Sequence, residues 1–455
     1  MTPPQLKPWE KISSISPSAL QPGSAYVSVD DQRQDNFHPY IFRTHDFGAH
    51  WQPIVTGLPA NQPVSVVRAD PVRAGLLYAG TTDGAYVSFD DGAHWQSLQL
   101  NLPNAWVKDL LVHDGDLIAA TQGRALWVLD DLAPLRQLTP AVVASPAHLF
   151  APEPAWRVHP DNNVDTPLPS STPQGQNPPA GAILDYWIGP HTHGPVSLAI
   201  YDRQGHRVRR FVSDAPPAPV PAHRYFAKRW LRPAERLSAA PGMHRFVWNL
   251  RYRRPAAIAY RYSMQAVFDH NTPTSVDGPY VLPGIYRVVL SAGGRTYRAS
   301  LVVRLDPREH VSPADLRALL TYSQSIGRAL GRVKALYDAQ QPVHHALRQL
   351  QGRIAAGQAP RRLAASVARL TARTCGTGAE GMLTLNRRLG ALEANAESAD
   401  RPPTVADERV LQALIAQFES AEAHWHHAVA EAERLNVQLR TIGLAPITLP
   451  PLPAH

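Results

Sequence analysis

Few of the side chains able to do acid–base or metal chemistry are grouped in the sequence. The densest group is Glu422, His424, His426 and His427. On a helix, His424 and His427 share one face while Glu422 and His426 share another, so four ligands do not gather on one side. The loop histidines His191 and His193 are weaker candidates. We therefore predict no metal site and no cofactor.

Carboxylates are the second group that could do chemistry. Glycoside hydrolysis requires two carboxyl groups that face each other across a cleft. Several aspartates are predicted to lie in loops, but no spacing singles out a pair among Asp30, Asp31, Asp35, Asp83, Asp114 and Asp116. Another cluster resembles calcium ligands without the glycine and final glutamate of a calcium loop: Asp161, Asn162, Asn163 and Asp165. We interpret that cluster as a turn-rich loop.

Nucleophilic catalysis finds no support in the sequence. Cys375 is the single cysteine and lies in a stretch of small residues, and no Gly-x-Ser-x-Gly elbow is present. No glycine-rich phosphate loop occurs either. The catalytic residues, if there are any, stay unknown at this stage.

Two segments, residues 44–52 and 88–96, share the pattern Ser/Thr-x-Asp-x-Gly-x-x-Trp, and their tryptophans are 44 residues apart. This is the Asp-box, or BNR repeat. Its aspartate accepts backbone N–H bonds in a tight turn, its glycine supplies a conformation that other residues resist, and its tryptophan packs beneath. We therefore predict structural rather than catalytic roles for Thr44, Asp46, Gly48, Trp51, Ser88, Asp90, Gly92 and Trp95.

The strands around these segments predict a repeated sheet. Alternating stretches precede each box, and a third unit repeats residues 77–81 and 85–91 forty residues later, although Leu132 replaces the turn glycine. Units of 40–45 residues with four short strands are typical of β-propeller blades. We predict that residues 1–135 form a partial propeller of about three four-stranded blades. Propellers close with about four to eight blades, so we expect further blades on another chain or a longer parent protein.

The rest of the chain predicts three more segments. Residues 136–180 are rich in proline and predict a linker, and the alternating strands of residues 181–306 predict an immunoglobulin-like β-sandwich. After residue 307 the apolar period changes to about three and a half, which predicts a helical hairpin or bundle over 307–445. Its helices are expected at 313–337, 343–356, 361–373, 382–395 and 404–439. The fold class is multidomain and mainly β, with helices at the end.

Composition restricts the partners. The 455 residues carry a formal charge of +8, but no block of five basic residues occurs, so nucleic acid is not an expected partner. The basic runs at 207–210 and 251–254 alternate with apolar residues or prolines, as on the solvent face of strands. No apolar run of membrane-spanning length is present, and the sequence begins without a signal-peptide pattern. The localisation stays open.

Four stretches carry a resemblance to a known family: residues 40–44, 123–131, 162–167 and 175–182. In these the sequence resembles large bacterial proteins with sortilin-like BNR-repeat propellers, often labelled glycosyl hydrolases. Such proteins are typically longer, with an export signal and further blades, so the resemblance implies that this chain corresponds to their C-terminal half. It carries over no catalytic residue, because the arginine triad and the acid and nucleophile pairs of sialidases have no match here.

Two functions follow as hypotheses. The first is a non-catalytic propeller and sandwich scaffold that binds a protein or glycan partner, as part of a longer exported protein. The alternative is a fragment or subunit of a glycoside hydrolase. A pair of carboxylates about 5 to 10 Å apart in one pocket favours the enzyme, whereas an exposed apolar or aromatic patch favours binding.

Overall fold

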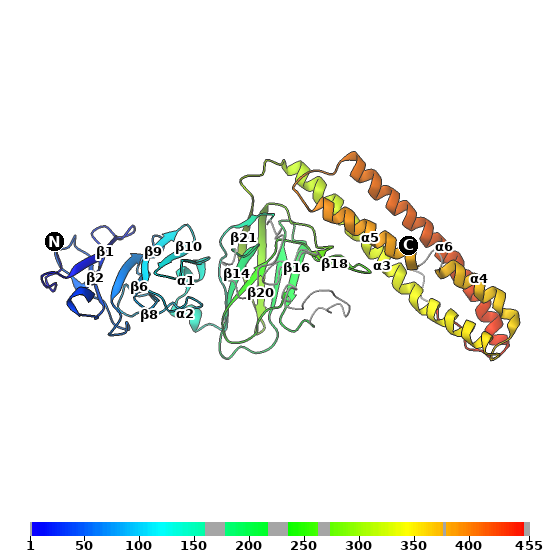
Figure 1. Cartoon of the computed structure of the whole chain (residues 1–455), viewed down its shortest axis with the longest axis horizontal. Helices are drawn as coiled ribbons and strands as arrows, with labels where there is room; N and C mark the ends of the chain where they lie inside the picture. Colours follow the sequence, from blue (N-terminus) through cyan, green and yellow to red (C-terminus); the bar gives the residue numbers. More distant parts are fainter. Residues whose placement is uncertain (1, 160–177, 217–234, 263–273, 376–378, 450–455) are drawn as a thin grey trace. The chain divides into compact units, whose positions relative to one another are not determined.

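The computed structural model describes residues 2–159, 178–216, 235–262, 274–375 and 379–449. The chain divides into two compact units. The first contains Met1–Glu153, Ile183–His193 and Ala240–Phe246, and the second contains Pro154–Ala182, Gly194–Ala239 and Val247–His455. Strands dominate the chain up to residue 305, and helices follow (Figure 1). The mainly β architecture with a C-terminal helical region is as predicted.

Three antiparallel sheets follow one another in the first unit (Figure 1). The first contains β1 (Lys11–Pro17), β2 (Ala25–Asp30), β3 (Tyr40–Thr44) and β4 (Gln52–Pro53), with the short helix η1 (Gln32–Gln34) between β2 and β3. The second contains β5 (Val64–Ala69), β6 (Leu77–Thr81), β7 (Ala85–Ser88) and β8 (Gln96–Ser97). The third contains β9 (Val107–His113), β10 (Asp116–Thr121) and β11 (Leu126–Leu129). Each sheet is a meander, with neighbouring strands in chain order.

The three sheets share a local irregularity that marks them as copies. In the pairing of its first two strands, each sheet shifts register once. The shift lies between Ile12 and Ser14 in the first sheet, between Val64 and Val66 in the second, and between Ala120 and Thr121 in the third. A β-bulge adds one residue and strengthens the local twist. The repeated bulge therefore gives the first strand of every sheet the same bend.

Successive sheets pack through shared apolar cores. The first and second sheets share a core that includes Tyr26, Ile41, Val64, Val67 and Trp95. The second and third share another, which includes Val66, Tyr78, Val87, Val107 and Leu110. Because each sheet has apolar side chains on both faces, each needs a neighbour on both sides.

The third sheet departs from the predicted alignment by one residue. Leu117 pairs with Leu129, whereas the equivalent Leu77 pairs with Ser88. The cause is a longer connection, since the Thr121 N–H donates to the Ala125 oxygen where the Thr81 N–H donates to the Gly84 oxygen. Leu129 therefore takes the place of Ser88, and the repeat is 41 residues here rather than 40.

The segment predicted to be a linker contains regular structure. It forms the short helices α1 (Ala133–Gln137) and α2 (Pro140–Val143) and the strands β12 (Ala147–Leu149) and β13 (Ala155–Arg157). Residues 160–177 lie outside the described residues, and with them the predicted calcium-like cluster and most of the family-like stretches after residue 160.

The predicted strands of residues 181–306 are all present, and they belong to two sheets. One sheet has the order β12-β14-β17, with β14 at Ala182–Ile188 and β17 at Gly242–Trp248. The other has the order β13-β21-β20-β15-β16, with β15 at Ser197–Tyr201, β16 at Arg207–Val212, β20 at Gly284–Ala292 and β21 at Arg295–Leu305. β18 (Arg261–Tyr262) and β19 (Thr274–Ser275) form a small pair. Within the larger sheet, β13 pairs with β21 in parallel, and the pairs β21–β20, β20–β15 and β15–β16 are antiparallel.

The helical region contains α3 (Pro313–Ala355), η3 (Arg361–Leu363), α4 (Ala364–Cys375), α5 (Ala379–Ala396) and α6 (Val405–Thr441). Ser312 caps α3 ahead of Pro313, and Thr404 with Asp407 forms a capping box on α6. The predicted break near residue 340 is wrong, because α3 continues through Pro342. A proline inside a helix removes one backbone hydrogen bond. The buried Leu336, Val343 and Leu347 on both sides of it hold the helix against the bundle core.

We predict that the two pattern tryptophans differ in their contribution to stability. Trp95 is buried in the core between the first two sheets, and its indole N–H donates to the Ile54 oxygen at 2.8 Å. Trp95→Ala should lower the free energy of unfolding by about 3–5 kcal/mol. Trp51 is the half-buried equivalent of Trp95, and Trp51→Ala should lower the free energy of unfolding by only about 1–2 kcal/mol. Denaturant unfolding measures both, and equal losses would contradict the packing described here.

Candidate functional site

The two Asp-x-Gly turns, residues 44–52 and 88–96, have the same hydrogen bonds. In the first turn, the Asp46 carboxylate accepts from the His50 backbone N–H at 2.9 Å and from the Thr44 hydroxyl at 2.9 Å, and it contacts the His50 ring at 2.6 Å. The Thr44 hydroxyl also accepts from the Gly48 N–H. Gly48 has a φ of 83°, in the left-handed region that favours glycine.

The second turn repeats this arrangement. Asp90 accepts from the His94 N–H at 2.9 Å and from the Ser88 hydroxyl at 2.8 Å, and its other oxygen contacts the His94 ring at 2.7 Å. The His50 N–H lowers the pKa of Asp46 to about 2. Burial acts to raise the pKa of Asp90, but its bonds to His94 and Ser88 lower it. Both carboxylates are therefore ionised acceptors committed to their own turns.

In the second turn, the residue after the Asp-box aspartate, Asp91, makes contacts outside the turn. Asp91 has a φ of 61°, and its carboxylate accepts from the Tyr26 hydroxyl at 2.5 Å and contacts Arg43 at 3.1 Å and His45 at 3.0 Å. Tyr26, Arg43 and His45 belong to the first sheet, so Asp91 ties the second sheet to it. Burial and the bond to Asp91 raise the pKa of Tyr26, which keeps this hydroxyl a proton donor.

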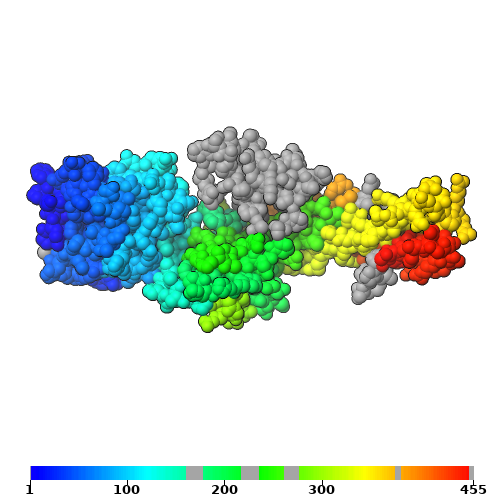
Figure 2. Space-filling model, turned by 90° about the horizontal axis from the view of Figure 1, so that it is seen from below, coloured from blue at the N-terminus to red at the C-terminus, as the bar shows by residue number. Residues whose placement is uncertain are grey.

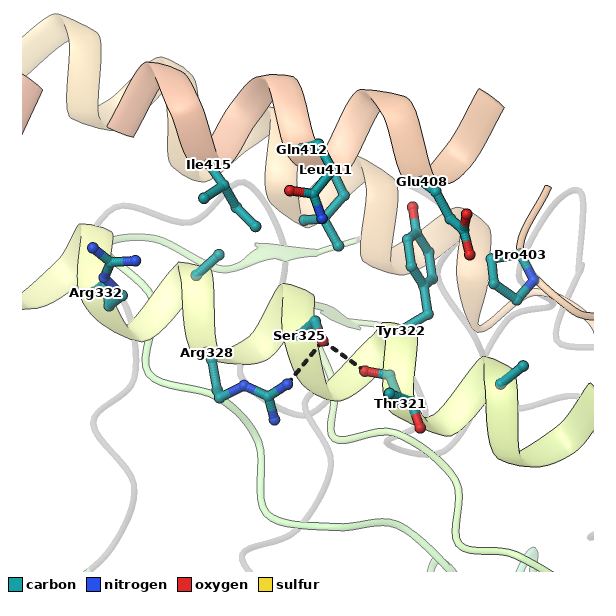
Figure 3. Close-up of a pocket in the computed structure, with 12 residues that line it drawn as sticks. Thr321, Tyr322, Ser325, Arg328, Arg332, Pro403, Glu408, Leu411, Gln412 and Ile415 are labelled. Atoms are coloured by element: carbon teal, nitrogen blue, oxygen red, sulfur yellow. Dashed lines mark hydrogen bonds between the residues drawn. The ribbon is translucent and has the colours of Figure 1, made fainter. Parts of the chain in front are cut away.

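A groove of about 770 Å³ lies between α3 and α6 (Figure 3). Its apolar part includes Tyr322, Leu411 and Ile415, and Figure 3 shows Arg328 and Glu408 on its polar part. The Tyr322 hydroxyl donates to the backbone carbonyl oxygen of Asp407 at 2.9 Å, which joins the two helices at one end. The groove has one carboxylate, Glu408, among its lining residues. It therefore offers an amphipathic surface and no carboxylate pair.

A buried ionic cluster joins the strands of the second unit to its helices. Arg157 at the end of β13 contacts Asp400 at 2.6 Å, and His159 contacts the same carboxylate oxygen at 2.9 Å. Neither Arg157 nor Asp400 exposes more than 3% of its side chain. Arg251 contacts Glu397 of the segment after α5 at 2.9 Å and lies over the Tyr280 ring. The cluster fixes the segment after α5 to the strands of this unit.

Glu393 lies beside this cluster in α5. One of its oxygens accepts from the Asp277 N–H at 3.2 Å. Burial, followed by the negative charge of Glu397, raises the pKa of Glu393 to about 8, while Arg251 acts in the opposite direction. Glu393 is only 3% exposed, so its protonated form is favoured at neutral pH.

The structure does not bring the other sequence candidates together. His424 contacts the Ser420 oxygen of its own helix, and no group of three His, Cys, Asp or Glu residues able to hold a metal occurs among the described residues. Asp31 accepts from Gln34 and Asn36, and Asp116 accepts from the Asp131 N–H. His191 and His193 lie in the loop after β14, and Cys375 ends α4. In the described part of the chain, no helix is long and apolar enough to cross a membrane.

Comparison with solved structures gives weak similarities. The chain is similar to a Niastella koreensis GH74 enzyme, with 11% identity, a TM-score of 0.22, and coverage of 26% of this chain and 21% of that chain. It is similar to a GH74 xyloglucanase from Xanthomonas campestris, with 15% identity, a TM-score of 0.22, and coverage of 64% and 38%. YCF48 bound to D1 peptide matches with 18% identity, a TM-score of 0.21, and coverage of 27% and 37%.

The matched regions span well under half the length of those three chains. TM-scores of this size do not carry an argument about fold or function. No family model matches the chain, and no curated protein matches it.

The sequence did not predict the roles of several polar residues. Arg251 was interpreted as part of a solvent-facing run, but its side chain is only 13% exposed and is paired with Glu397. Its backbone forms a β-bridge with Tyr280. Arg157, Glu393, Glu397 and Asp400 gave no signal, because residues far apart in the sequence form the cluster. Asp91 did give a signal: it is the charged residue where the first turn has Phe47.

We predict a pH dependence of stability from Glu393. Its folded pKa of about 8 lies above the ordinary value of 4.5, so the folded state holds a proton that the unfolded state releases between these values. The free energy of unfolding should therefore fall as pH rises through this window, by roughly 1–3 kcal/mol. Glu393→Gln should remove this slope and be more stable than the natural chain at pH 9.

Chemical denaturation at pH 5, 7 and 9 measures the effect. Glu433→Gln, which changes an exposed glutamate of α6, is the matched control and should keep the slope. A slope that is unchanged in Glu393→Gln would refute the assignment.

Proposed function

We propose that this chain is a non-catalytic scaffold that binds a protein partner. Its first 135 residues are interpreted as three blades of an Asp-box propeller, followed by an immunoglobulin-like sandwich over 181–306 and a helical bundle over 307–445. The resemblance to sortilin-like BNR-repeat proteins supports a role as the C-terminal part of a longer exported protein. A glycan partner is the competing ligand class.

One observation carries this proposal. The carboxylates of Asp46 and Asp90, the aspartates of the repeated pattern, are committed to hydrogen bonds inside their own turns. A catalytic carboxylate must instead reach a substrate, either as a proton donor or as a nucleophile. The repeated pattern is therefore a folding device, and it does not support hydrolysis.

Two further features favour binding over hydrolysis and protein over glycan. The groove between α3 and α6 has a single lining carboxylate, so it lacks the pair that glycoside hydrolysis requires. The sheets expose large aliphatic side chains, among them Ile15 at 62%, Leu111 at 55% and Leu126 at 70%. Exposed aliphatic groups favour a protein surface as partner.

The experiment that tests this proposal measures hydrolysis and stability separately. We expect the purified chain to release no more reducing sugar from xyloglucan, and no more sialic acid from a sialoside, than the heat-denatured chain does. We also expect Asp90→Asn to lower the midpoint of thermal unfolding, because the turn loses its anionic acceptor. Asp83→Asn, at an exposed loop aspartate of the same sheet, is the control and should leave the midpoint unchanged.

Sugar release that a single carboxylate substitution abolishes would overturn the proposal in favour of a glycoside hydrolase. An unchanged unfolding midpoint in Asp90→Asn would show that the turn does not depend on the carboxylate.

A further inference from the structure

Two positions that are buried in the second and third sheets are exposed in the first sheet. Two apolar residues in the first strand of each sheet face the preceding sheet, and the shared bulges align them. They are Val64 and Val67 in the second sheet and Val107 and Leu110 in the third, and all four are at most 1% exposed. The first sheet has Ile12 and Ile15 at these positions, with 39% and 62% exposure. We call this surface the leading face.

The opposite end shows the same difference. On the side facing the next sheet, Ile41 in the first sheet and Ala85 in the second are buried, but the equivalent Leu126 in the third is 70% exposed. Val87 in the second sheet is 2% exposed, and its equivalent Val128 is 50% exposed. Val128 and Leu111 both pair with Ile118, so these three side chains form one row across the sheet. We call Leu111, Ile118, Leu126 and Val128 the trailing face.

These two faces are the two halves of one kind of contact. Between the first and second sheets, and again between the second and third, leading positions of one sheet pack with the next-sheet side of its neighbour. Figure 2 shows the dark blue first sheet against the lighter blue second sheet. The trailing face thus has the side-chain positions that a leading face fits, and one copy of this chain carries both.

We propose that the leading face of one copy binds the trailing face of a second copy. This rests on one part of the proposed function, that the three sheets are propeller blades, and it takes the further blades from a second copy rather than from a longer parent chain. A contact between two different faces either repeats without end or closes into a ring. Two copies supply six sheets, which lies within the roughly four to eight that close a propeller. The two copies then share two identical contacts.

The N-terminal segment covers part of the outward side of the first sheet and leaves its first strand exposed. Leu6 packs on the cluster of Val27, Val29 and Phe42 in the first sheet, and Gln5 bonds to the Trp51 oxygen. These residues cover the middle of that sheet. Ile12 and Ile15, in its first strand, remain exposed beside the cover. The first strand, which contributes to the inter-sheet contact elsewhere, is therefore left open here.

The test uses the full chain and two substitutions, Ile15→Asp on the leading face and Leu111→Asp on the trailing face. Light scattering after gel filtration, over a series of concentrations, should show the natural chain approaching twice its mass of 49.9 kDa. A carboxylate buried in an apolar contact is strongly unfavourable, so each variant alone should dissociate with a Kd raised about a hundredfold or more.

Mixing the two variants distinguishes this arrangement from a contact between like faces. Ile15→Asp keeps an intact trailing face and Leu111→Asp keeps an intact leading face, so the mixture should form a heterodimer through one contact. Val72→Asp is the matched control, because Val72 is 63% exposed in the turn between β5 and β6 and belongs to neither face. Circular dichroism should show that all three variants fold.

A natural chain that stays monomeric at every concentration overturns the proposal, and so does self-association that neither substitution weakens. Failure of the mixture to associate, with each variant folded, overturns the head-to-tail arrangement. These results are independent of sugar release, so a failure here is distinguishable from a failure of the proposed scaffold function.

Discussion

The structure of the first unit depends on the packing of one sheet against the next. A short antiparallel sheet with apolar side chains on both faces is stable only when both faces are covered. In this chain the second sheet meets that requirement, with Val64 and Val67 buried on one side and Tyr78 and Val87 on the other. The outer faces of the first and third sheets do not meet it fully. This constraint connects the repeat, the exposed aliphatic residues and the expectation of a partner.

The second unit depends on charge as well as apolar packing. Arg157 and Asp400 form a buried ion pair, and Arg251 and Glu397 next to them form a partly buried one; both pairs join segments more than a hundred residues apart. Burying charged groups is costly unless they are paired. Such pairs therefore specify one arrangement of strand and helix, because any other arrangement would leave a buried charge without its partner. Tyr280 packs against Arg251 and adds a cation–π contact to that arrangement.

Local sequence patterns predicted the helices and strands well, whereas features that depend on contacts between distant residues were not predicted. The strands and helices follow from alternation, turn glycines and caps, which are encoded within a few residues of each other. The register of the third sheet was wrong by one residue, since a single added residue before Ala125 leaves almost no trace in the apolar pattern. The continuity of α3 through Pro342 was missed because tertiary packing outweighs a local breaker. The ionic cluster could not be predicted from the sequence, because its residues come together only in the folded chain.

The pair that Asp91 makes with Arg43 has a consequence for how the sheets keep their order. Arg68 and Asp109 form a comparable pair, at 2.6 Å, between the second and third sheets. Val128 stands in the third sheet where the first has Arg43, and Leu111 stands where the second has Arg68. Joints inside the chain are thus partly electrostatic and sensitive to ionic strength, whereas a joint made by the exposed end of the third sheet would lack both arginines. Salt therefore acts on the two kinds of joint in opposite ways: it screens the internal pairs, and salting-out ions strengthen burial at the ends.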